Sequence, residues 1–431
     1  MRVHVIGGGL AGVEAAYFLA NKGVKVKLYE MRPHKMTEAH QTDKLGELVC
    51  SNSLRSNDIK TAVGLLKREM EALGSLVIKA AKAAQIHGGT SLMVDREEFS
   101  KYITNEIKSH ENIEIISKEV TKVDLETPTI ICAGPLASNN LVNHLLELTG
   151  EENLNFYDAV APIISFDSIN LDICYFKDRY EDGRGTYLNC PMTKLEYDNF
   201  YKALVNAERY APKDFERAIF EACMPIEVMA ERGYQTPLFG PLKPVGLEVD
   251  GIRPYAVVQL RPEDFSNKMY NLVGFQTSLR QGAQREVIKM IPGLENAEIL
   301  RYGVVHRNTY FNSPKILNNG FNFKKYPNLY LAGQISGVEG YVESAASGIA
   351  AAISLYNKII NGENLFLPDV TITGSLSKYV STPNSNFVPM NANFGIVPSL
   401  EEKVRKKERR EAYAKRALDS LEKFKKENEC I

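Results

Sequence analysis

The apolar positions at the start of the chain predict a strand, a turn and a helix in immediate succession. Val3, Val5 and Ile6 form a short apolar run, and apolar or small residues then recur at helical spacing between Ala11 and Leu19. A second apolar run, from Val24 to Tyr29, predicts another strand. The first thirty residues therefore place one helix between two strands.

This periodicity is lost between Met31 and Asn57, where we expect a polar loop. A polar stretch of more than about 15 residues inside a compact domain is usually functional or disordered. Beyond it, the capping-box spacing of Asp95 and Glu98 predicts the start of a helix. The other elements predicted in this part are helices at 59–73 and 99–107 and strands at 113–116, 120–125 and 129–134.

Between about residues 154 and 300 the sequence shifts to short strands, tyrosines and prolines, with helices expected at 195–208 and 214–222. A strand at 328–332, a glycine turn and a small-residue helix at 341–359 follow. A charged helix is expected from Glu401 onward. We therefore predict one domain in two parts (1–153 and 301–400), an insertion (154–300) and a basic C-terminal helix (401–431).

The glycines of the first turn have the spacing of a dinucleotide site. Gly7, Gly9 and Gly12 fit G-x-G-x-x-G, which gives a sharp turn, close approach of the backbone to a pyrophosphate, and close packing of helix on strand. Glu30 lies 30 − 12 = 18 residues past the last glycine, where a carboxylate accepts hydrogen bonds from a ribose 2′-hydroxyl. Such an acid favours FAD or NAD over NADP.

A second glycine turn, from Gly333 to Gly337, favours FAD. It would bring another helix N-terminus to the cofactor, and the strand ending in Ala133 and Gly134 would pass close to it again. We therefore predict an α/β protein with a Rossmann-like FAD-binding domain, similar to that of glutathione reductase, and an inserted α+β domain. The expected cofactor-binding residues are Gly7, Gly8, Gly9, Leu10, Ala11, Gly12, Glu30, Arg32, Ala133, Gly134, Gly333, Gln334 and Ile335.

Charge and cysteine usage narrow the class of protein. The 431 residues carry a formal net charge of −1, so an RNA partner would have to be held by a local basic surface. The six cysteines contain no CxxC pair, which fits neither a disulfide framework nor a zinc site and favours a reducing compartment. We expect a cytoplasmic protein with no metal, no signal peptide and no membrane segment.

Cys50 differs from the cysteines in apolar runs. Cys132 and Cys174 lie in predicted strands, as expected of buried thiols. Cys50 lies in the polar loop, where Arg55 would stabilise an exposed thiolate. Cys223 ends a predicted helix and, from the residues alone, is a weak candidate for a reactive thiol.

Long motifs in the chain resemble one family. They follow the order of the folate- and FAD-dependent tRNA uracil-5-methyltransferases, namely GGGLAGVEAA, ELVCSNSLRSN, EACMPIEVMAERG, HRNTYFNSP, LAGQISGVEGYVESAASG and NFVPMNANFG. The resemblance covers nearly the whole chain. The related glucose-inhibited-division proteins, which modify tRNA wobble uridines, share the glycine loop but are longer and have a different cysteine motif.

The resemblance implies methylation of uridine C5 in the T loop of tRNA, at position 54, with 5,10-methylenetetrahydrofolate as the carbon donor. FAD would relay the carbon and supply a hydride, and NAD(P)H would restore reduced FAD. Uracil C5 becomes a nucleophile after a thiolate adds at C6, a role that we assign to Cys223 with the support of the family motif. Cys50 would lie beside the flavin and act on the methylene intermediate or remove the C5 proton. His306 and Arg307 are expected to contact substrate, with His306 facing the pterin unless it is a structural histidine.

A basic run near the C-terminus is the candidate RNA-binding surface. Between Lys403 and Arg416, eight Lys or Arg accompany two Glu, a surplus of 8 − 2 = +6. Such a run is usually a solvated helix, and the alternative is a helix that contacts phosphate. The candidate RNA contacts are Lys403, Arg405, Lys406, Lys407, Arg409 and Arg410.

Three other functions remain open from the sequence. A flavin NAD(P)H oxidase or dithiol reductase would pair Cys50 with Cys223 and need neither folate nor RNA. A non-catalytic, flavin-bound protein would bind RNA without methylating it. A paralogue with the same chemistry would methylate a ribosomal RNA uridine.

Overall fold

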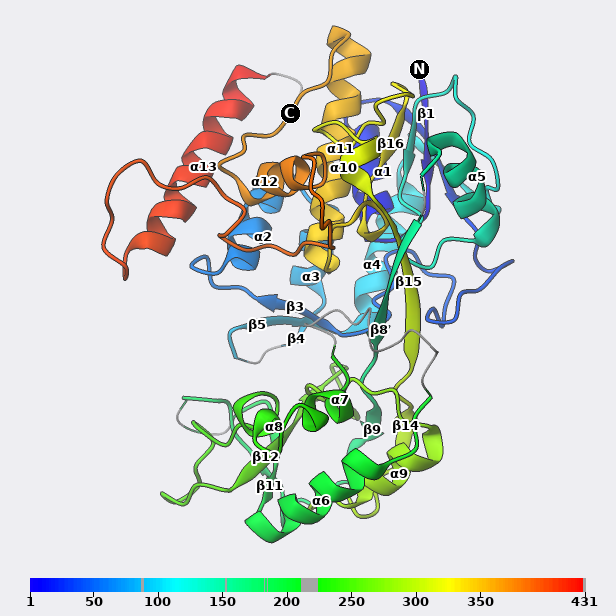
Figure 1. Ribbon diagram of the computed structural model, residues 1–431. Helices are drawn as coiled ribbons and strands as arrows, with labels where there is room; N and C mark the ends of the chain where they lie inside the picture. Colours follow the sequence, from blue (N-terminus) through cyan, green and yellow to red (C-terminus); the bar gives the residue numbers. More distant parts are fainter. Residues whose placement is uncertain (87–88, 152, 182, 184, 211–223, 429–431) are drawn as a thin grey trace.

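A computed structural model of the chain describes residues 1–86, 89–151, 153–181, 183, 185–210 and 224–428. It has two halves, one above the other in Figure 1. Two antiparallel strands, β8 (Asn153–Ala159) and β15 (Val305–Phe311), pair along their whole length and run between the halves. The N-terminus and the last helix both belong to the upper half.

A five-stranded parallel sheet forms the centre of the upper half, in the order β16-β7-β1-β2-β6. β1 is flanked by β2 on one side and by β7 on the other, so the strand order reverses at β1. In open parallel sheets, ligands bind beyond the carboxyl ends of the strands at such a reversal. The strands are β1 (Arg2–Ile6), β2 (Lys25–Glu30), β6 (Ile113–Ser117), β7 (Thr129–Ile131) and β16 (Leu329–Leu331).

Two helices that follow the two glycine turns pack against each other beside this sheet. They are α1 (Leu10–Asn21) and α11 (Tyr341–Asn361), and Gly348 lets them approach closely, because a Cβ there would lie 2.1 Å from the carbonyl oxygen of Ala11. In the view of Figure 1, α11 and α5 lie to opposite sides of the sheet. The remaining helices of the upper half are α2 (Ala62–Ala72), α3 (Leu76–Ala83), α4 (Arg96–Ser109), α5 (Asn139–Thr149), α10 (Ser313–Ile316), η4 (Gln334–Ser336), α12 (Ile372–Tyr379) and α13 (Arg409–Glu427).

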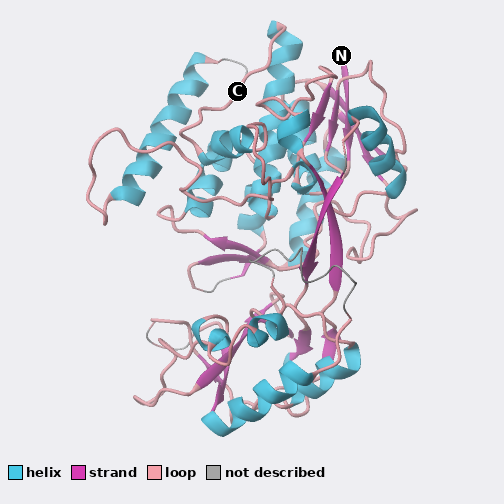
Figure 2. Ribbon diagram, viewed as in Figure 1, coloured by secondary structure: helices cyan, strands magenta, loops and turns pink. Residues whose placement is uncertain are grey.

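A small antiparallel sheet lies at the lower edge of the upper half (Figure 2). Its order is β3-β5-β4, and its strands are β3 (Ser53–Ser56), β4 (Gln85–Ile86) and β5 (Ser91–Val94). β3 follows directly on the loop that carries Cys50.

The lower half is built on a six-stranded antiparallel sheet with its own buried apolar cluster. Its strands are β9 (Ile163–Ser165), β10 (Tyr175–Phe176), β11 (Leu188–Met192), β12 (Ala256–Pro262), β13 (Met269–Leu272) and β14 (Ile299–Arg301). Its helices are η1 (Phe166–Ser168), α6 (Lys194–Asn206), α7 (Ile226–Glu231), α8 (Thr236–Phe239) and α9 (Gln281–Lys289). We propose the predicted domain boundaries 153/154 and 300/301 for these halves, with the difference that β14 of the lower sheet continues one residue past the second boundary, to Arg301.

The helix start at Asp95 is as predicted, but its capping box is incomplete. The Asp95 carboxylate accepts hydrogen bonds from the N–H groups of Glu97 and Glu98, both at 3.0 Å. The backbone N–H of Asp95 is already bonded to the carbonyl oxygen of Ala84, so Glu98 pairs with Lys101 instead.

Two of the predicted elements differ from those in the structure. Residues 120–125 are irregular, because Asp124 closes a turn by accepting hydrogen bonds from Glu126 N–H and Thr127 Oγ1. The C-terminal helix begins at Arg409 rather than near Glu401. Its buried face starts at Ala414, and residues 401–408 offer no apolar stripe that could be buried in the same way. The helix predicted at 214–222 lies outside the described residues.

Candidate cofactor and active site

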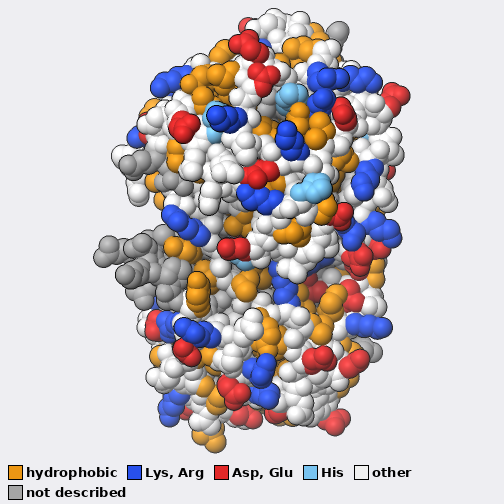
Figure 3. Space-filling model, turned by 90° about the vertical axis from the view of Figure 1, so that its right-hand side faces the viewer, with side chains coloured by type: hydrophobic (Ala, Val, Ile, Leu, Met, Phe, Trp, Pro, Cys, Tyr) orange, Lys and Arg blue, Asp and Glu red, His pale blue; other side chains and the backbone are white. Residues whose placement is uncertain are grey.

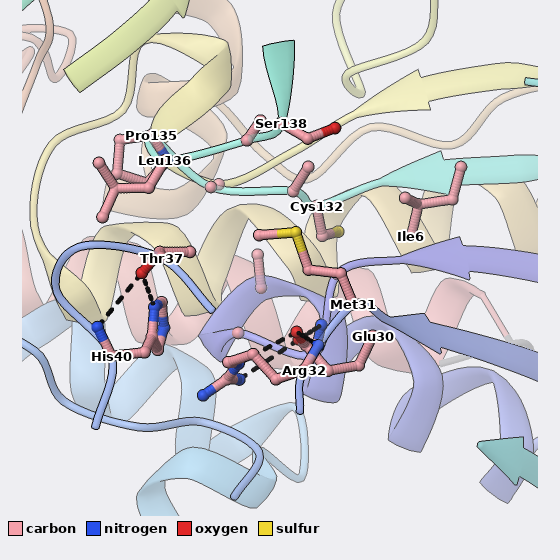
Figure 4. Close-up of a pocket in the computed structure, with 18 of the residues that line it drawn as sticks. Ile6, Glu30, Met31, Arg32, Thr37, His40, Cys132, Pro135, Leu136 and Ser138 are labelled. Carbon is pink, nitrogen blue, oxygen red and sulfur yellow. Dashed lines mark hydrogen bonds and ion pairs between the residues drawn. The ribbon is translucent and has the colours of Figure 1, made fainter. Parts of the chain in front are cut away.

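A pocket lies beyond the carboxyl end of β1, where the two glycine turns meet. Its wall combines segments from far apart in the chain, including 6–11, 29–32, 132–138 and 333–334. In Figure 4, Glu30 and Arg32 lie on one side of this pocket, and Cys132 and the segment Pro135–Ser138 on the other. The strand reversal at β1 therefore forms a cavity of the kind expected for a dinucleotide.

The three motif glycines have different surroundings. A Cβ at Gly7 would lie 2.3 Å from the carbonyl oxygen of Cys132, and one at Gly12 would lie 1.8 Å from that of Gly7. Both positions are needed for close packing of the turn. No described atom lies within 4 Å of a Cβ built on Gly9, and Gly9 lines the pocket. The space beside Gly9 fits a pyrophosphate that approaches the backbone closely.

Glu30 is held in place at the end of β2. Its Oε2 accepts a hydrogen bond from Gly8 N–H at 2.9 Å, and its Oε1 accepts one from Arg32 N–H and one from Arg32 Nε, each at 3.0 Å. Burial acts to raise the pKa of Glu30, but the hydrogen bonds and charge of Arg32 outweigh burial and lower it. A fixed, ionised carboxylate at this point suits a ribose 2′-hydroxyl.

Glu30→Ala is expected to weaken FAD binding about 10- to 150-fold. This range corresponds to the roughly 1.5 to 3 kcal/mol of a hydrogen bond to a charged group. The FAD dissociation constant of the refolded apoprotein, measured by quenching of flavin fluorescence, checks the prediction. An unchanged constant would mean that Glu30 does not contact the ribose.

The structure brings most of the predicted cofactor residues together. Those that line the pocket are Gly7, Gly8, Gly9, Leu10, Ala11, Glu30, Arg32, Ala133, Gly134, Gly333 and Gln334. Gly12 and Ile335 do not line it. Gly12 packs behind the turn against Gly7, and Ile335 is fully buried in the core. Their expected contact with the cofactor remains a prediction.

Tyr341, at the start of α11, joins the pocket to Cys50. Its side chain lines the pocket, and its hydroxyl oxygen accepts hydrogen bonds from the N–H groups of Cys50 (2.6 Å) and Ser51 (3.1 Å). Burial raises the pKa of Tyr341, so the hydroxyl stays protonated. The backbone of the Cys50 loop is thus tied to the cofactor pocket across 291 residues of sequence.

Three arginines surround the Cys50 loop. Arg96 Nη2 donates to the carbonyl oxygen of Cys50 at 3.0 Å, Arg261 Nη2 to Ser51 Oγ at 2.9 Å, and Arg301 Nη2 to the carbonyl oxygen of Val49 at 3.0 Å. Arg261 and Arg301 come from the lower half. The loop therefore lies where the two halves meet and is bonded to both.

Cys50 is not the exposed thiolate that the sequence suggested. The thiol is partly buried, and burial raises its pKa; Asp158 raises it further, against the three arginines. Arg55 has a left-handed backbone (φ 61°) and pairs with Glu343 of α11. The guanidinium of Arg55 therefore forms an ion pair with Glu343 and does not stabilise a thiolate at Cys50. The nucleophilic form of cysteine is the thiolate. A thiol that stays protonated is therefore better suited to transferring a proton than to attacking a carbon atom.

Buried polar atoms without a hydrogen-bond partner in the described structure gather around this loop. They include Asn52 Oδ1, Arg261 Nε, Glu263 Oε1 and both ring nitrogens of His306. Such orphaned atoms are rare in folded proteins and each calls for an explanation, such as a ligand or water. A polar ligand or water at the junction of the halves would give these atoms hydrogen-bond partners.

The structure separates the two predicted substrate contacts. His306 is buried and Arg307 is exposed, because neighbouring residues of β15 point to opposite faces. Burial lowers the pKa of His306, and the charge of Arg301 lowers it further, so its ring is neutral near pH 7. A neutral ring with two free nitrogens suits an aromatic heterocycle such as a pterin. Arg307 does not share that face.

The dithiol alternative receives no structural test, because Cys223 lies outside the described residues. The chain is described again from Met224, and Ile226 N–H donates to the carbonyl oxygen of Gln276. Among the described cysteines, Cys174 and Cys190 approach each other, with their sulfur atoms 3.3 Å apart in the buried core of the lower half.

Sequence reasoning missed the residues that hold the Cys50 loop, namely Tyr341, Arg96, Arg261 and Arg301. Tyr341 stood within a motif that carried the resemblance, but its partner is 291 residues away. The arginines lie in ordinary strands and helices and acquire a role when the halves meet. Groups of three or more potential metal ligands are absent from the described residues, and no helix there is long and apolar enough to span a bilayer.

Comparison with protein families gives one match that spans most of the chain. The family described as "Glucose inhibited division protein A" matches residues 2–363. Among solved structures, Aquifex aeolicus GidA in its form I crystal has a TM-score of 0.70 at 18% sequence identity, over 97% of this chain and 76% of that one. This likeness shows the fold, a Rossmann-like α/β fold with an insertion, as the sequence predicted.

Curated relatives are much closer in sequence. A methylenetetrahydrofolate--tRNA-(uracil-5-)-methyltransferase TrmFO from Acholeplasma laidlawii is 56% identical over 423 residues, covering 98% of this chain and 99% of that protein. The protein of the same name from Bacillus subtilis is 55% identical over 425 residues, covering 97% and 98%. The one from Staphylococcus aureus strain Newman is 55% identical over 430 residues, covering 98% and 99%.

Proposed function

Because this chain belongs to the family of methylenetetrahydrofolate--tRNA-(uracil-5-)-methyltransferases, within the glucose inhibited division protein A family, we propose that its pocket and Cys50 loop together form the methylation site. The enzyme is a FAD-dependent transferase that moves one carbon from 5,10-methylenetetrahydrofolate to uridine C5 of tRNA, with NAD(P)H as reductant. We place the target in the T loop, at position 54, and the reaction in the cytoplasm.

The observation that carries the site assignment is the contact made by Tyr341. One side chain lines the cofactor pocket and also holds the backbone of Cys50 through two hydrogen bonds. A thiol at the edge of a flavin site can move a proton to or from a reacting carbon held there. Cys50 would in this way act on the transferred carbon or on the C5 proton.

The residues of the pocket suit FAD. The space beside Gly9 would hold the pyrophosphate, Glu30 would hold the ribose, and the end near Tyr341 would hold the flavin ring. FAD supplies the hydride that turns a carbon at the formaldehyde level into a methyl group. The protein's part is to orient the partners and exclude water at the junction of the halves.

His306 would face the folate. It is buried on β15, where it is paired in register with Asp158 of β8. His40, which lines the pocket, has a pKa lowered to about 4, first by burial and then by the charge of Arg32, so its ring is neutral as well. We assign Cys223 to addition at uracil C6, on the family motif that surrounds it.

The substrate assignment is tested by labelling two kinds of RNA side by side. The enzyme with FAD, NADPH and methylene-labelled folate is incubated with unmodified tRNA and, separately, with unmodified ribosomal RNA. We expect label in tRNA at a rate at least tenfold above that in ribosomal RNA. Label found only in ribosomal RNA would support folate-dependent methylation but would overturn the assignment of tRNA as the substrate.

A further inference from the structure

A basic hollow lies at the surface of the upper half, outside the cofactor pocket. It is lined by the start of α2, by the segment 392–394 and by the first turns of α13; the lining residues are Lys60, Thr61, Ala62, Ala392, Asn393, Phe394, Arg409, Arg410 and Tyr413. In Figure 1, α13 and α2 lie at the left-hand edge of the upper half.

Positive charge dominates this hollow and the segment that leads into it. Within residues 403–410 six Lys or Arg accompany a single Glu, and all of these charged side chains are exposed. Lys60 is paired with Glu411 at 2.5 Å, and both are about half exposed. Arg409 and Arg410 lie in the first turn of α13, where the helix dipole disfavours positive charge. A bound anion would offset that cost.

Two aromatic rings line the hollow. The rings of Phe394 and Tyr413 stack, with centroids 5.3 Å apart and planes at 25°. Arg416 lies 5.2 Å from the centre of the Tyr413 ring and donates to the carbonyl oxygen of Ser399 at 2.8 Å. Lys425 Nζ donates to the carbonyl oxygen of Ala72 at the end of α2. The helix is thereby fixed to the rest of the upper half before any ligand arrives.

The hollow is also connected to the Cys50 loop. Ala392 N–H, on its wall, donates at 2.8 Å to Glu343 Oε1, the carboxylate that pairs with Arg55. Lys67 of α2 donates to the carbonyl oxygens of Leu54 and Ser56, both at 2.7 Å. The elements that line the hollow therefore also hold the segment that continues from Cys50.

We propose that this hollow binds the sugar-phosphate backbone of the tRNA substrate, with Arg409 and Arg410 on phosphate and the Phe394–Tyr413 pair beneath a ribose or an unpaired base. The inference rests on the proposed function. It also narrows the RNA-binding surface predicted from the sequence. The proposed contacts lie in a hollow that Arg409 and Arg410 share with Lys60, and not along a solvated helix. On the side turned away from α13, cationic and anionic side chains are interspersed (Figure 3). The basic surface beside α13 is therefore the better electrostatic match for RNA, which is a polyanion.

The test compares two double substitutions on one helix in the full-length FAD-loaded enzyme. Arg409→Gln/Arg410→Gln removes two charges from the hollow. Lys415→Gln/Lys423→Gln removes two charges from α13 at positions paired with Asp419 and Glu427, away from the hollow lining. For each protein, the tRNA dissociation constant is measured at several salt concentrations, together with FAD content and melting temperature.

We expect the arginine variant to bind tRNA 10- to 100-fold more weakly. The slope of log affinity against log salt concentration should become shallower by about 1.4 to 1.8, the value for two phosphate contacts. Its FAD content and its melting temperature should match the wild type. The lysine variant should retain at least half of the wild-type affinity.

Equal losses in the two variants would mean that only overall charge matters and would overturn the assignment of the hollow. Wild-type affinity and slope in the arginine variant would do the same, while leaving the methyltransferase function intact. Failure of the wild-type enzyme itself to bind or methylate tRNA would overturn the proposed function together with the hollow.

Discussion

Cys50→Ala is expected to lower the rate of tRNA methylation by about 10²- to 10⁴-fold, the contribution of a positioned proton-transfer group. FAD content should be unchanged, because Cys50 is held through its backbone N–H and carbonyl groups, which alanine retains. Single-turnover formation of labelled methyluridine measures the loss. Cys174→Ala is the matched control, since its thiol is buried in the lower half, away from the pocket.

The same variant separates the roles of the two thiols. Cys50→Ala should still form a denaturation-resistant complex with tRNA containing 5-fluorouracil, because Cys223 remains to add at C6. Cys223→Ala should form no such complex. A stable complex with Cys223→Ala and none with Cys50→Ala would reverse the assignment.

Gly9→Ala is expected to abolish FAD retention without preventing folding. The added methyl group would meet no described protein atom within 4 Å and would instead project into the space assigned to the pyrophosphate. The variant should purify colourless, with the circular dichroism of the wild-type apoprotein. The flavin absorbance per mole of protein gives the result.

Gly282→Ala is the control for Gly9→Ala. Its Cβ also meets no described atom within 4 Å, but it lies at an exposed position of α9 in the lower half. It should stay fully yellow. A yellow Gly9→Ala protein with full flavin content would show that the pyrophosphate does not approach this glycine.

The nucleotide end of the site was predictable because its signals are local. The glycine spacing, the acid at the end of β2 and the second glycine turn each lie within one strand–turn–helix unit, and local patterns of this kind determine backbone geometry. Gly9 and Glu30 therefore line the pocket where the sequence placed them.

The reacting end was less predictable because it is made by contacts between distant segments. Arg55, five residues after Cys50, is turned away by a left-handed backbone, and Arg96, Arg261 and Arg301 take the places around the loop. The burial that raises the pKa of Cys50 also depends on the two halves meeting. The arginine closest to Cys50 in the sequence is therefore not one of those that surround its loop in the structure.

The length of the last helix shows the same limit on a smaller scale. The basic composition of residues 401–431 suggested one continuous helix, but helix formation follows the buried stripe at Ala414, Ala417 and Leu421. The preceding basic residues are left in a loop. That loop leads into the hollow assigned to RNA.

The central claim is that the folate carbon reaches uridine C5 of tRNA with help from FAD and Cys50. Its most direct test uses folate labelled with ¹³C in the methylene group, NADPH and unmodified tRNA, followed by mass spectrometry of tRNA fragments. We predict one added ¹³C-methyl group on a T-loop uridine, present only when folate, NADPH and FAD-loaded enzyme are all supplied. Oxidation of NADPH with no ¹³C in the tRNA would contradict the account.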